Sequence, residues 1–589
     1  MVSRLISFIQ KEIGGLHEAA YLLGLAAIAS QVLALVRDRL LAHGFGAGTE
    51  LDLYYAAFRI PDFLFVTIAS LVSASVLIPF LSQKFAMGEG VTDGSAANAA
   101  NGKVGSHGGH SEGKKFFDVV FTVFFVAIIL VAAIVFIFAP ALVPLVLPGF
   151  RDPETLQTLV ALTRILLLSP IFLGFSNLFA SITQLRSRFF IYALSPLVYN
   201  LGIIFGALFL VPSFGLHGLV AGVVIGAFAH MAVQVPFIAS EGMFPVFARA
   251  REWPVAFAAM ALSVPRTLAI SATEISKFFL ISTASLLAAG SISVFNFAWN
   301  LQSVPLSIIG VSYSMAAFPT LTKYISSGEH RKYVEHVITA TRHIIFLCLP
   351  VAAIFIVLRA QIVRVILGSG EFSWSDTRLT AAMLAIFMLS LVSQSLVLLF
   401  TRARYSSSNT KTPVVINIVT AALTIVSAIV LLRVYKAVPA FHDFFANLLR
   451  VGDVADTSVL ILPLAFSIGV TIAAIIHIFS FHREFKAYSA PLEKSNLHQV
   501  GQTFFESLMA SLIMAVSAYV TLNILDDVFS IDTFIGIFFQ GFFAGLVGLG
   551  LSVVFLVLIK NRETAEIWQT LHRKFWRAPV VGPDAESVI

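Results

Sequence analysis

The sequence predicts an all-α polytopic membrane protein with about 14 transmembrane helices, arranged as two pseudo-symmetric six-helix lobes plus two C-terminal helices. The first observation behind this prediction is composition, because 58% of the 589 residues are hydrophobic and only 12% are charged. A soluble protein of this length cannot keep so much apolar surface away from water, so the lipid bilayer must be its solvent. The other two observations are the long apolar runs along the chain and the short internal matches between its halves.

The apolar runs predict the number of spans and their orientation. A transmembrane helix needs about 20 mostly apolar residues, and about fourteen runs meet this requirement. Their centres lie near residues 28, 70, 130, 170, 201, 226, 270, 306, 352, 388, 424, 469, 513 and 545. Lysine and arginine concentrate in alternate short loops, whereas the loops near residues 212 and 288 hold neither. Because positive residues favour the cytoplasmic side, both termini are predicted to be cytoplasmic, which agrees with an even number of spans.

We expect two lobes of six spans each, followed by further segments. The predicted segments are an N-terminal interfacial helix at 1–18, an N-lobe at 19–240 with a flexible cytoplasmic loop at 86–114, a C-lobe at 250–485, two further spans at 498–560 and a cytoplasmic amphipathic tail at 561–589. The loop is rich in Gly, Ser, Ala and Asn, which is typical of flexible linkers. Both ends have the mixed apolar and basic character of helices that lie on a membrane surface, and the start lacks the features of a secretory signal.

Two pairs of short motifs indicate that the chain repeats itself. IPFLSQK at 78–84 resembles FPTLTKY at 318–324, and PLVYN at 196–200 resembles PVVIN at 413–417. The members of each pair are separated by roughly 220 to 240 residues, so each repeat would hold six spans in the same orientation. Pseudo-symmetric lobes around a central site are typical of alternating-access transporters.

Composition and motifs argue against other classes of protein. The net charge of +6 comes from basic residues that cluster at span ends, so we expect no nucleic-acid partner. The single cysteine, Cys348, excludes an internal disulfide and a Cys-rich metal site. His107 and His110 lie in the flexible loop, without a fixed scaffold for a metal. The chain has no Gly-rich phosphate loop, HExxH motif or nucleophile elbow, so we expect neither a cofactor nor an enzyme.

The first candidate site is a set of charges around spans 1 and 2. Its members are Arg37, Asp38, Arg39, Asp52, Arg59 and Asp62. Charge at membrane depth is expensive and is normally hidden in a protein interior or a wet cavity, where it is used. We expect Arg37 and Arg59 to contact an anion and the aspartates to hold them in place. The alternative is that the charges near Arg37 merely mark the outer end of span 1, although that end should be poor in positive charge.

The second candidate site lies on spans 7 and 8. Span 7 carries Arg266, Glu274 and Lys277, and the last two are three residues apart, so they share a helix face and are able to pair. Either they form a structural ion pair, or Lys277 or Arg266 meets an anion while Glu274 balances charge or takes a proton. Span 8 adds the uncharged polar groups of Asn296, Trp299, Asn300 and Gln302, which suit either a sugar or amide ligand or helix packing.

Several stretches resemble one family of membrane transporters. VRDRLLAHGFGAGTELDLYYAAFRIPDF at 36–63 is similar to the first-helix signature of the MurJ (MviN) family of lipid II flippases, within the multidrug/oligosaccharidyl-lipid/polysaccharide (MOP) exporter superfamily. Further matches are PGF at 148–150, ASITQLRSRFF at 180–190, GLHGLVAGVVIGA at 215–227, AAGSIS at 288–293 and TKTP at 410–413. The resemblance covers roughly residues 20 to 560, in order, and identifies the chain as a divergent member.

The resemblance implies a fold, a substrate and a set of site residues. The fold has two six-helix lobes, two extra helices and a central cationic cavity built largely from helices 1, 2, 7 and 8. The implied substrate is lipid II, an undecaprenyl-pyrophosphate-linked disaccharide peptide, which moves by alternating access to the outer leaflet of the bacterial cytoplasmic (inner) membrane for peptidoglycan assembly. By motif position, Arg37 and Asp52 match polar residues of the family's first two helices, and Arg59 matches a basic one. Coupling to the membrane potential, H⁺ or Na⁺ stays open, and cell-wall synthesis proteins are expected partners.

The chain also departs from the family at cationic positions. Gln31 replaces a common arginine, Phe65 and Val66 replace a basic pair, and Trp299 and Asn300 replace an Asp-Arg pair. We therefore offer the hypothesis that Arg266 and Lys277 on span 7 compensate for the missing cations. The alternatives are a carrier of another polyprenyl-linked glycan or of a drug cation, a non-transporting scaffold for cell-wall synthesis, and a polytopic glycosyltransferase. A drug exporter would favour acidic over basic cavity residues, which argues against that alternative.

Overall fold

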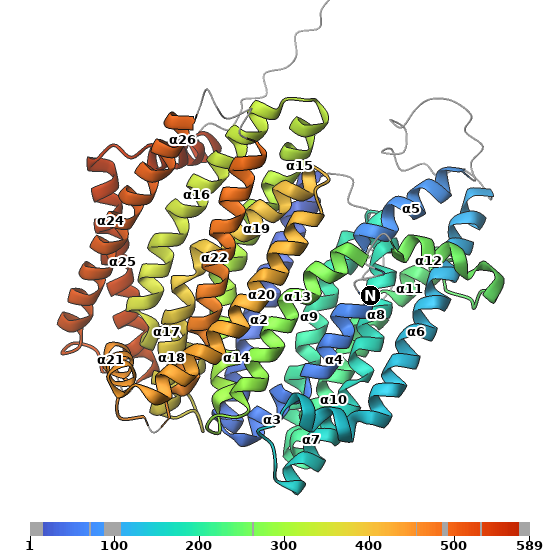
Figure 1. Cartoon of the computed structure of the whole chain (residues 1–589), viewed down its shortest axis with the longest axis horizontal. Coiled ribbons are helices and arrows are strands. Elements are labelled where there is room, and N and C mark those ends of the chain that lie inside the picture. The colour runs from blue at the N-terminus through green and yellow to red at the C-terminus, as the bar shows by residue number, and fades with distance from the viewer. Residues whose placement is uncertain are drawn as a thin grey trace, which may run out of the picture. The chain divides into compact units, whose positions relative to one another are not determined.

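The computed structural model is helical throughout its regular structure (Figure 1). It describes residues 16–69, 72, 74–87, 108–261, 264–454, 456–485, 493–530 and 533–576, and this part of the chain contains no strand. The all-α prediction is therefore confirmed for the described residues. Most of the predicted N-terminal helix at 1–18, the centre of the 86–114 loop with His107, and the end of the tail at 561–589 lie outside them.

The chain divides into two compact units, which are described separately. Unit 1 comprises residues 1–301, 366–383 and 409–473, and unit 2 comprises residues 302–365, 384–408 and 474–589. These units are defined by contact between residues and differ from the predicted lobes at 19–240 and 250–485, which stay a prediction. The helices α14, α17, α18 and α22 each contribute residues to both units.

Unit 1 holds most of the helices of the first half of the chain. They are α2 (Leu16–Phe45), α3 (Thr49–Ala57), α4 (Arg59–Leu64), η1 (Phe65–Ala69), α5 (Ala74–Met87), α6 (Gly108–Val146), α7 (Pro153–Leu166), α8 (Leu168–Leu185), α9 (Phe189–Phe205), η4 (Gly206–Leu210), α10 (Val211–Ala232), α11 (Val235–Ser240), η5 (Ala250–Glu252), α12 (Trp253–Ala261), α13 (Val264–Ala284) and most of α14 (Ser291–Pro305), with α20 (Lys411–Ala437), α21 (Pro439–Leu449), η7 (Ser458–Leu460), and the first parts of α18 (Trp374–Leu389) and α22 (Ile461–Glu484) from later in the chain. A buried apolar cluster joins α5, α6, α8, α11 and α12.

Helices α9 and α10 of unit 1 pack at very short range. Gly202 and Gly206 lie directly against Gly222 and Gly226, and a Cβ atom on any of them would collide with the facing backbone. Small residues at such positions let two membrane helices approach closely enough for extensive van der Waals contact. Helix α2 packs on α9 as well, so this pair supports the helix that carries Arg37.

Unit 2 is built around a helix hairpin. It contains η6 (Leu306–Val311), α15 (Ser312–Ser326), α16 (His330–Val357), most of α17 (Arg359–Leu367), α19 (Leu391–Ser406), α24 (Glu493–Leu525), α25 (Phe534–Leu558) and α26 (Arg562–Trp576). Helices α24 and α25 pack along each other, and α24 packs along α16. Small apolar clusters such as Phe346, Ala510 and Leu556 join the three helices.

The number of spans depends on how bent helices are counted. Nine helices of the described chain are long and apolar enough to cross a membrane, or ten if α18 and α19, which are bent by 46°, form one span. One of the nine, Phe189–Ser240, has 52 residues and bends at Gly215, whose φ of 55° is left-handed. At 1.5 Å per residue its length is about two and a half times the thickness of the hydrocarbon core, so it provides two spans. Multiple spans are thus confirmed, but the predicted count of 14 is not.

A buried polar network fixes α26 to the rest of unit 2. Arg342 on α16 pairs with Glu563 on α26, and both side chains are at least 95% buried. Thr503 on α24 donates to the same carboxylate at 2.7 Å, and Asn561 donates to its other oxygen at 3.1 Å. Burial opposes ionisation of Glu563, but the hydrogen bonds from Thr503 and Arg342 outweigh it and keep the pKa of this carboxylate below its ordinary value.

The Glu563→Gln change tests whether this network stabilises the protein. Breaking a buried ion pair leaves an uncompensated charge on Arg342, so we expect a loss of about 3 kcal/mol at pH 7. Because the folded pKa lies below the value of about 4.3 for an unpaired glutamate, this stabilisation is complete above that pH and is lost as the pH falls through the folded pKa. Thermal unfolding in detergent at pH 7 and about pH 3 measures it.

The matched control is Glu112→Gln, which removes the exposed pair with Lys115. An exposed pair of this kind contributes about 0.5 kcal/mol or less, so its midpoint should barely move at either pH. Equal midpoints for wild type and Glu563→Gln at pH 7 would show that the network does not stabilise unit 2.

Candidate functional site

The centre of the first candidate site is the ion pair between Arg37 and Asp38 on α2. Arg37 donates to Oδ1 of Asp38 from Nε at 3.0 Å and from Nη2 at 2.7 Å. The Asp38 side chain is 2% exposed and that of Arg37 is 19% exposed. Charge-assisted contacts of this kind are what makes a buried carboxylate tolerable in an apolar helix. The prediction that an aspartate holds Arg37 in place is therefore confirmed, with Asp38 as the partner.

Two asparagines connect this ion pair to other helices. Asn300 on α14 donates from Nδ2 to Oδ2 of Asp38 at 2.9 Å. Asn200 on α9 accepts from Nη1 of Arg37 at 3.2 Å through Oδ1. The network thus joins α2, α9 and α14 within unit 1. Asn300 was predicted as a site residue, and the structure places it against Asp38.

Asp52 has a different environment from the one predicted. Its Oδ2 accepts from the backbone N–H of Gly290 at 2.7 Å, and its Oδ1 accepts from the N–H and hydroxyl of Ser293 at 2.7 and 2.6 Å. These donors lie at the N-terminus of α14, where unpaired N–H groups and the helix dipole favour a carboxylate. Asp52 therefore ties α3 to the start of α14, and the structure records no arginine among the hydrogen-bond partners of this described side chain.

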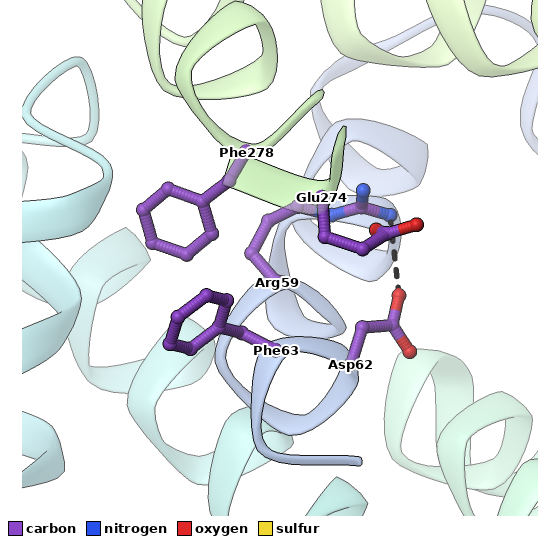
Figure 2. Close-up of a pocket in the computed structure, with 5 residues that line it drawn as sticks. All are labelled: Arg59, Asp62, Phe63, Glu274 and Phe278. Carbon is purple, nitrogen blue, oxygen red and sulfur yellow. Dashed lines mark ion pairs between the residues drawn. The ribbon is translucent and has the colours of Figure 1, made fainter. Parts of the chain in front are cut away.

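A pocket lies where α4 faces α13 (Figure 2). It is small and is lined by Arg59, Asp62, Phe63, Glu274 and Phe278. Arg59 is buried, donates from Nε to the carbonyl oxygen of Tyr55 at 3.2 Å and lies 3.7 Å from the Asp62 carboxylate. In Figure 2 an ion pair joins the Arg59 guanidinium to Asp62, and the two phenylalanine rings, 5.9 Å apart, form the other wall. The pocket thus combines ionisable groups with apolar walls.

The sequence left open whether Lys277 pairs with Glu274 or faces an anion, and the structure does not show the pair. In the described chain the ammonium lies over the ring of Trp299, 5.2 Å from its centroid, and no ion pair with Glu274 is formed. A cation over an indole face is attracted by the ring quadrupole, which competes with an i,i+3 pair on one helix. Lys277 still interacts electrostatically with Arg59, Glu274 and Asp62. Lys277 is thereby directed towards α14.

The predicted site residues therefore form two neighbouring groups within unit 1. Arg37 and Asn300 belong to the network on α2, α9 and α14; Arg59, Glu274 and Lys277 belong to the surroundings of the pocket. Tyr199 interacts electrostatically with both Arg37 and Asp62, which relates the two groups. Arg266 lies on α13, and its side chain is outside the described part of the structure.

Sequence reasoning missed two kinds of site residue. Asn200 was noted only as the end of a repeated motif, although an amide inside an apolar run is itself a signal of a buried polar contact. Phe63 and Phe278 were not selected, because nothing in the sequence distinguishes them from the other 53 phenylalanines. Their role as pocket walls depends on which helix faces they occupy, which only the packing of α4 on α13 determines.

Long apolar helices that bring charged side chains from distant spans to one polar site define a polytopic membrane transporter. The family model of lipid II flippase MurJ matches residues 41–441, which is more than half of the chain. The chain belongs to this lipid II flippase MurJ family.

Curated relatives agree with this assignment. The lipid II flippase MurJ of Burkholderia cenocepacia is 25% identical over 396 residues, which are 66% of this chain and 73% of that protein. The probable lipid II flippase MurJ of Rhizobium tropici is 26% identical over 403 residues, covering 66% and 70%. That of Thermotoga maritima is 27% identical over 399 residues, covering 67% and 75%.

Solved structures support the same fold. A lipid II flippase MurJ in an inward closed conformation matches with a TM-score of 0.70 and 22% identity, covering 92% of this chain and 100% of that one. An inward-facing multidrug resistance MATE family transporter of the MOP superfamily matches with a TM-score of 0.60 and 14% identity, covering 78% and 96%. The transporter fold predicted from the sequence is thereby confirmed.

The Asp52→Asn change distinguishes a structural from a ligand-binding role for this residue. The amide supplies one acceptor where the carboxylate supplies two, and its NH₂ group faces backbone N–H donors. We therefore expect a loss of about 1–3 kcal/mol in stability, seen as a lower unfolding midpoint in detergent. The affinity of the remaining folded protein for its lipid should be unchanged. An unchanged midpoint with weakened lipid binding would instead support the direct contact predicted from the sequence.

Proposed function

We propose that this protein moves lipid II, the undecaprenyl-pyrophosphate-linked disaccharide peptide, from the inner to the outer leaflet of the bacterial cytoplasmic membrane by alternating access. Membership of the lipid II flippase MurJ family supports this proposal. The observation that carries it is the cluster of charged and polar side chains from α2, α4, α13 and α14, the helices that correspond to predicted spans 1, 2, 7 and 8. A site of this kind suits a large polar headgroup that must pass through hydrocarbon.

The physical problem is to carry a doubly charged pyrophosphate and its sugars across about 30 Å of hydrocarbon. Arg37 and Arg59 would contact the pyrophosphate, since guanidinium groups match phosphate oxygens in charge and geometry. The polyprenyl tail would stay in the bilayer, so the site has to enclose the headgroup alone. Transport of this kind breaks and forms no covalent bond, and we propose no catalytic residue.

The energy source is proposed from the charges of the site. A cationic binding site that returns empty across the membrane moves with the inside-negative potential, which contributes roughly 2.3 kcal/mol per charge per 100 mV. Glu274, which lines the pocket beside Arg59, is the proposed group for coupling to H⁺. We further propose that both termini are cytoplasmic and that cell-wall synthesis proteins are its partners.

Complementation of a bacterial strain depleted of its lipid II flippase tests the proposed function. The wild-type chain should restore growth, and Arg37→Ala and Arg59→Ala should abolish it at equal protein levels. The matched control is Arg331→Ala, because this arginine is 64% exposed and its ion pair in the described chain is with Glu335, four residues away. Rescue by wild type that survives both site changes would favour a scaffold, and no rescue by a well-expressed wild type would favour a different polyprenyl-linked glycan.

The compensation hypothesis makes a separate prediction for α13. Each of Lys277→Ala and Arg266→Ala should lower lipid II transport in reconstituted vesicles by roughly 10-fold or more, since a hydrogen bond to a charged group contributes about 1.5–3 kcal/mol. Lys277→Arg keeps the charge and should retain most of the activity. Unchanged transport in both alanine variants would show that these residues do not replace the missing family cations.

A further inference from the structure

Asn200 is a buried amide on α9 whose orientation is set by its surroundings. Its side chain is 6% exposed. Nδ2 donates to the Pro196 carbonyl oxygen at 3.1 Å and to the Ser30 hydroxyl at 3.4 Å. Because both acceptors lie on the Nδ2 side, Oδ1 is directed to Nη1 of Arg37, at 3.2 Å. This assignment of the amide follows from the hydrogen-bond network.

The bond from Asn200 determines how the Arg37 guanidinium is held. A guanidinium has five N–H donors in a rigid plane. Nε and one N–H of Nη2 are used on Asp38, and one N–H of Nη1 is used on Asn200. Within the described part of the chain the two remaining N–H groups donate no hydrogen bond. One lies on each terminal nitrogen, and phosphate oxygens are strong acceptors for such charged donors.

Asp38 alone does not fix the direction of these two N–H groups. Both bonds to Asp38 end on the same oxygen, Oδ1, which leaves the guanidinium free to pivot about that atom. The hydrogen bond from the other terminal nitrogen, Nη1, ends on Asn200 of a different helix. This second point of attachment prevents the pivot. Preorganised donors of this kind bind an anion without the cost of ordering the side chain.

We propose that Asn200 is a positioning residue for the anion site: it holds Arg37 so that the two remaining N–H groups meet the pyrophosphate of the lipid substrate. This inference rests on the proposed function and extends it to α9, which the sequence did not include in the site. Asn200 acts through Arg37 and is not itself a ligand of the lipid.

A double-mutant cycle on lipid II binding tests the inference. The dissociation constant of lipid II is measured with purified, monodisperse protein in detergent for wild type, Arg37→Ala, Asn200→Ala and the double variant. We expect Asn200→Ala to weaken binding about 5- to 20-fold in the wild-type background, as for loss of a charge-assisted hydrogen bond. In the Arg37→Ala background it should have no further effect, because coupled residues are not additive.

Two further variants separate positioning from folding. Ser30→Ala removes only one of the two acceptors of Asn200 Nδ2, so the dissociation constant should change less than about 3-fold. Asn200→Leu keeps the branched shape of the side chain without a polar group and should reproduce the effect of Asn200→Ala. Agreement of the two Asn200 variants keeps the result independent of a cavity in the core.

The outcomes distinguish this inference from the proposed function. If Arg37→Ala weakens binding but Asn200→Ala does not, or weakens it by the same factor in both backgrounds, the positioning role is overturned and the proposed function stands. If Arg37→Ala leaves lipid II binding unchanged, the proposed anion contact and the positioning role are both overturned.

Discussion

The constraint on which the site depends is that a charge inside an apolar helix must be paired. Arg37 and Asp38 are neighbours near the end of α2, so each supplies the other's counter-charge. Neither is satisfied by the pair alone, because a carboxylate accepts several bonds and a guanidinium donates five. Asn300 of α14 takes up part of the remaining capacity of Asp38, and Asn200 of α9 takes up part of that of Arg37. The need to satisfy one ion pair therefore fixes three helices relative to one another within unit 1.

Helix α14 is held by hydrogen bonds at two positions along its length, and these determine the direction of the Trp299 side chain. Asp52 binds its first N–H groups, beside Gly290, whose φ of 88° and contact with the Ala47 carbonyl leave no room for a Cβ atom. Two and a half turns further on, Asn300 is bonded to Asp38. With both points fixed, Trp299 has a defined direction, and Lys277 of α13 lies over its ring. The carboxylates predicted to hold arginines therefore also orient the helix that carries the uncharged part of the site.

The sequence was informative wherever a charged residue interrupts an apolar run. Arg37, Arg59 and Glu274 are conspicuous in apolar runs, so the site helices were predictable. The hydrogen-bond partners of these residues were harder to predict. Asn200 lies 163 positions from Arg37 in the sequence, and helix packing alone brings the two together. Local spacing made a Glu274–Lys277 pair one of two alternatives, and a tertiary contact with Trp299 takes its place. The span count was obscured for a similar reason, since bends at Gly215 and at Ser390 change where one helix is judged to end.

Two π-helical turns lie directly beside the helices that carry the site residues. Arg59 and Asp62 lie on α4, directly before the π-helical turn η1, and Asn300 lies on α14, directly before the π-helical turn η6. The starts of these turns are separated along the chain by nearly the same interval as the matched motifs at 78–84 and 318–324. Such turns contain an extra residue, weaken the regular hydrogen bonding and concentrate at functional sites. Alternating access requires spans that bend without unfolding, and in spans 2 and 8 the turns supply such points immediately beside the polar residues.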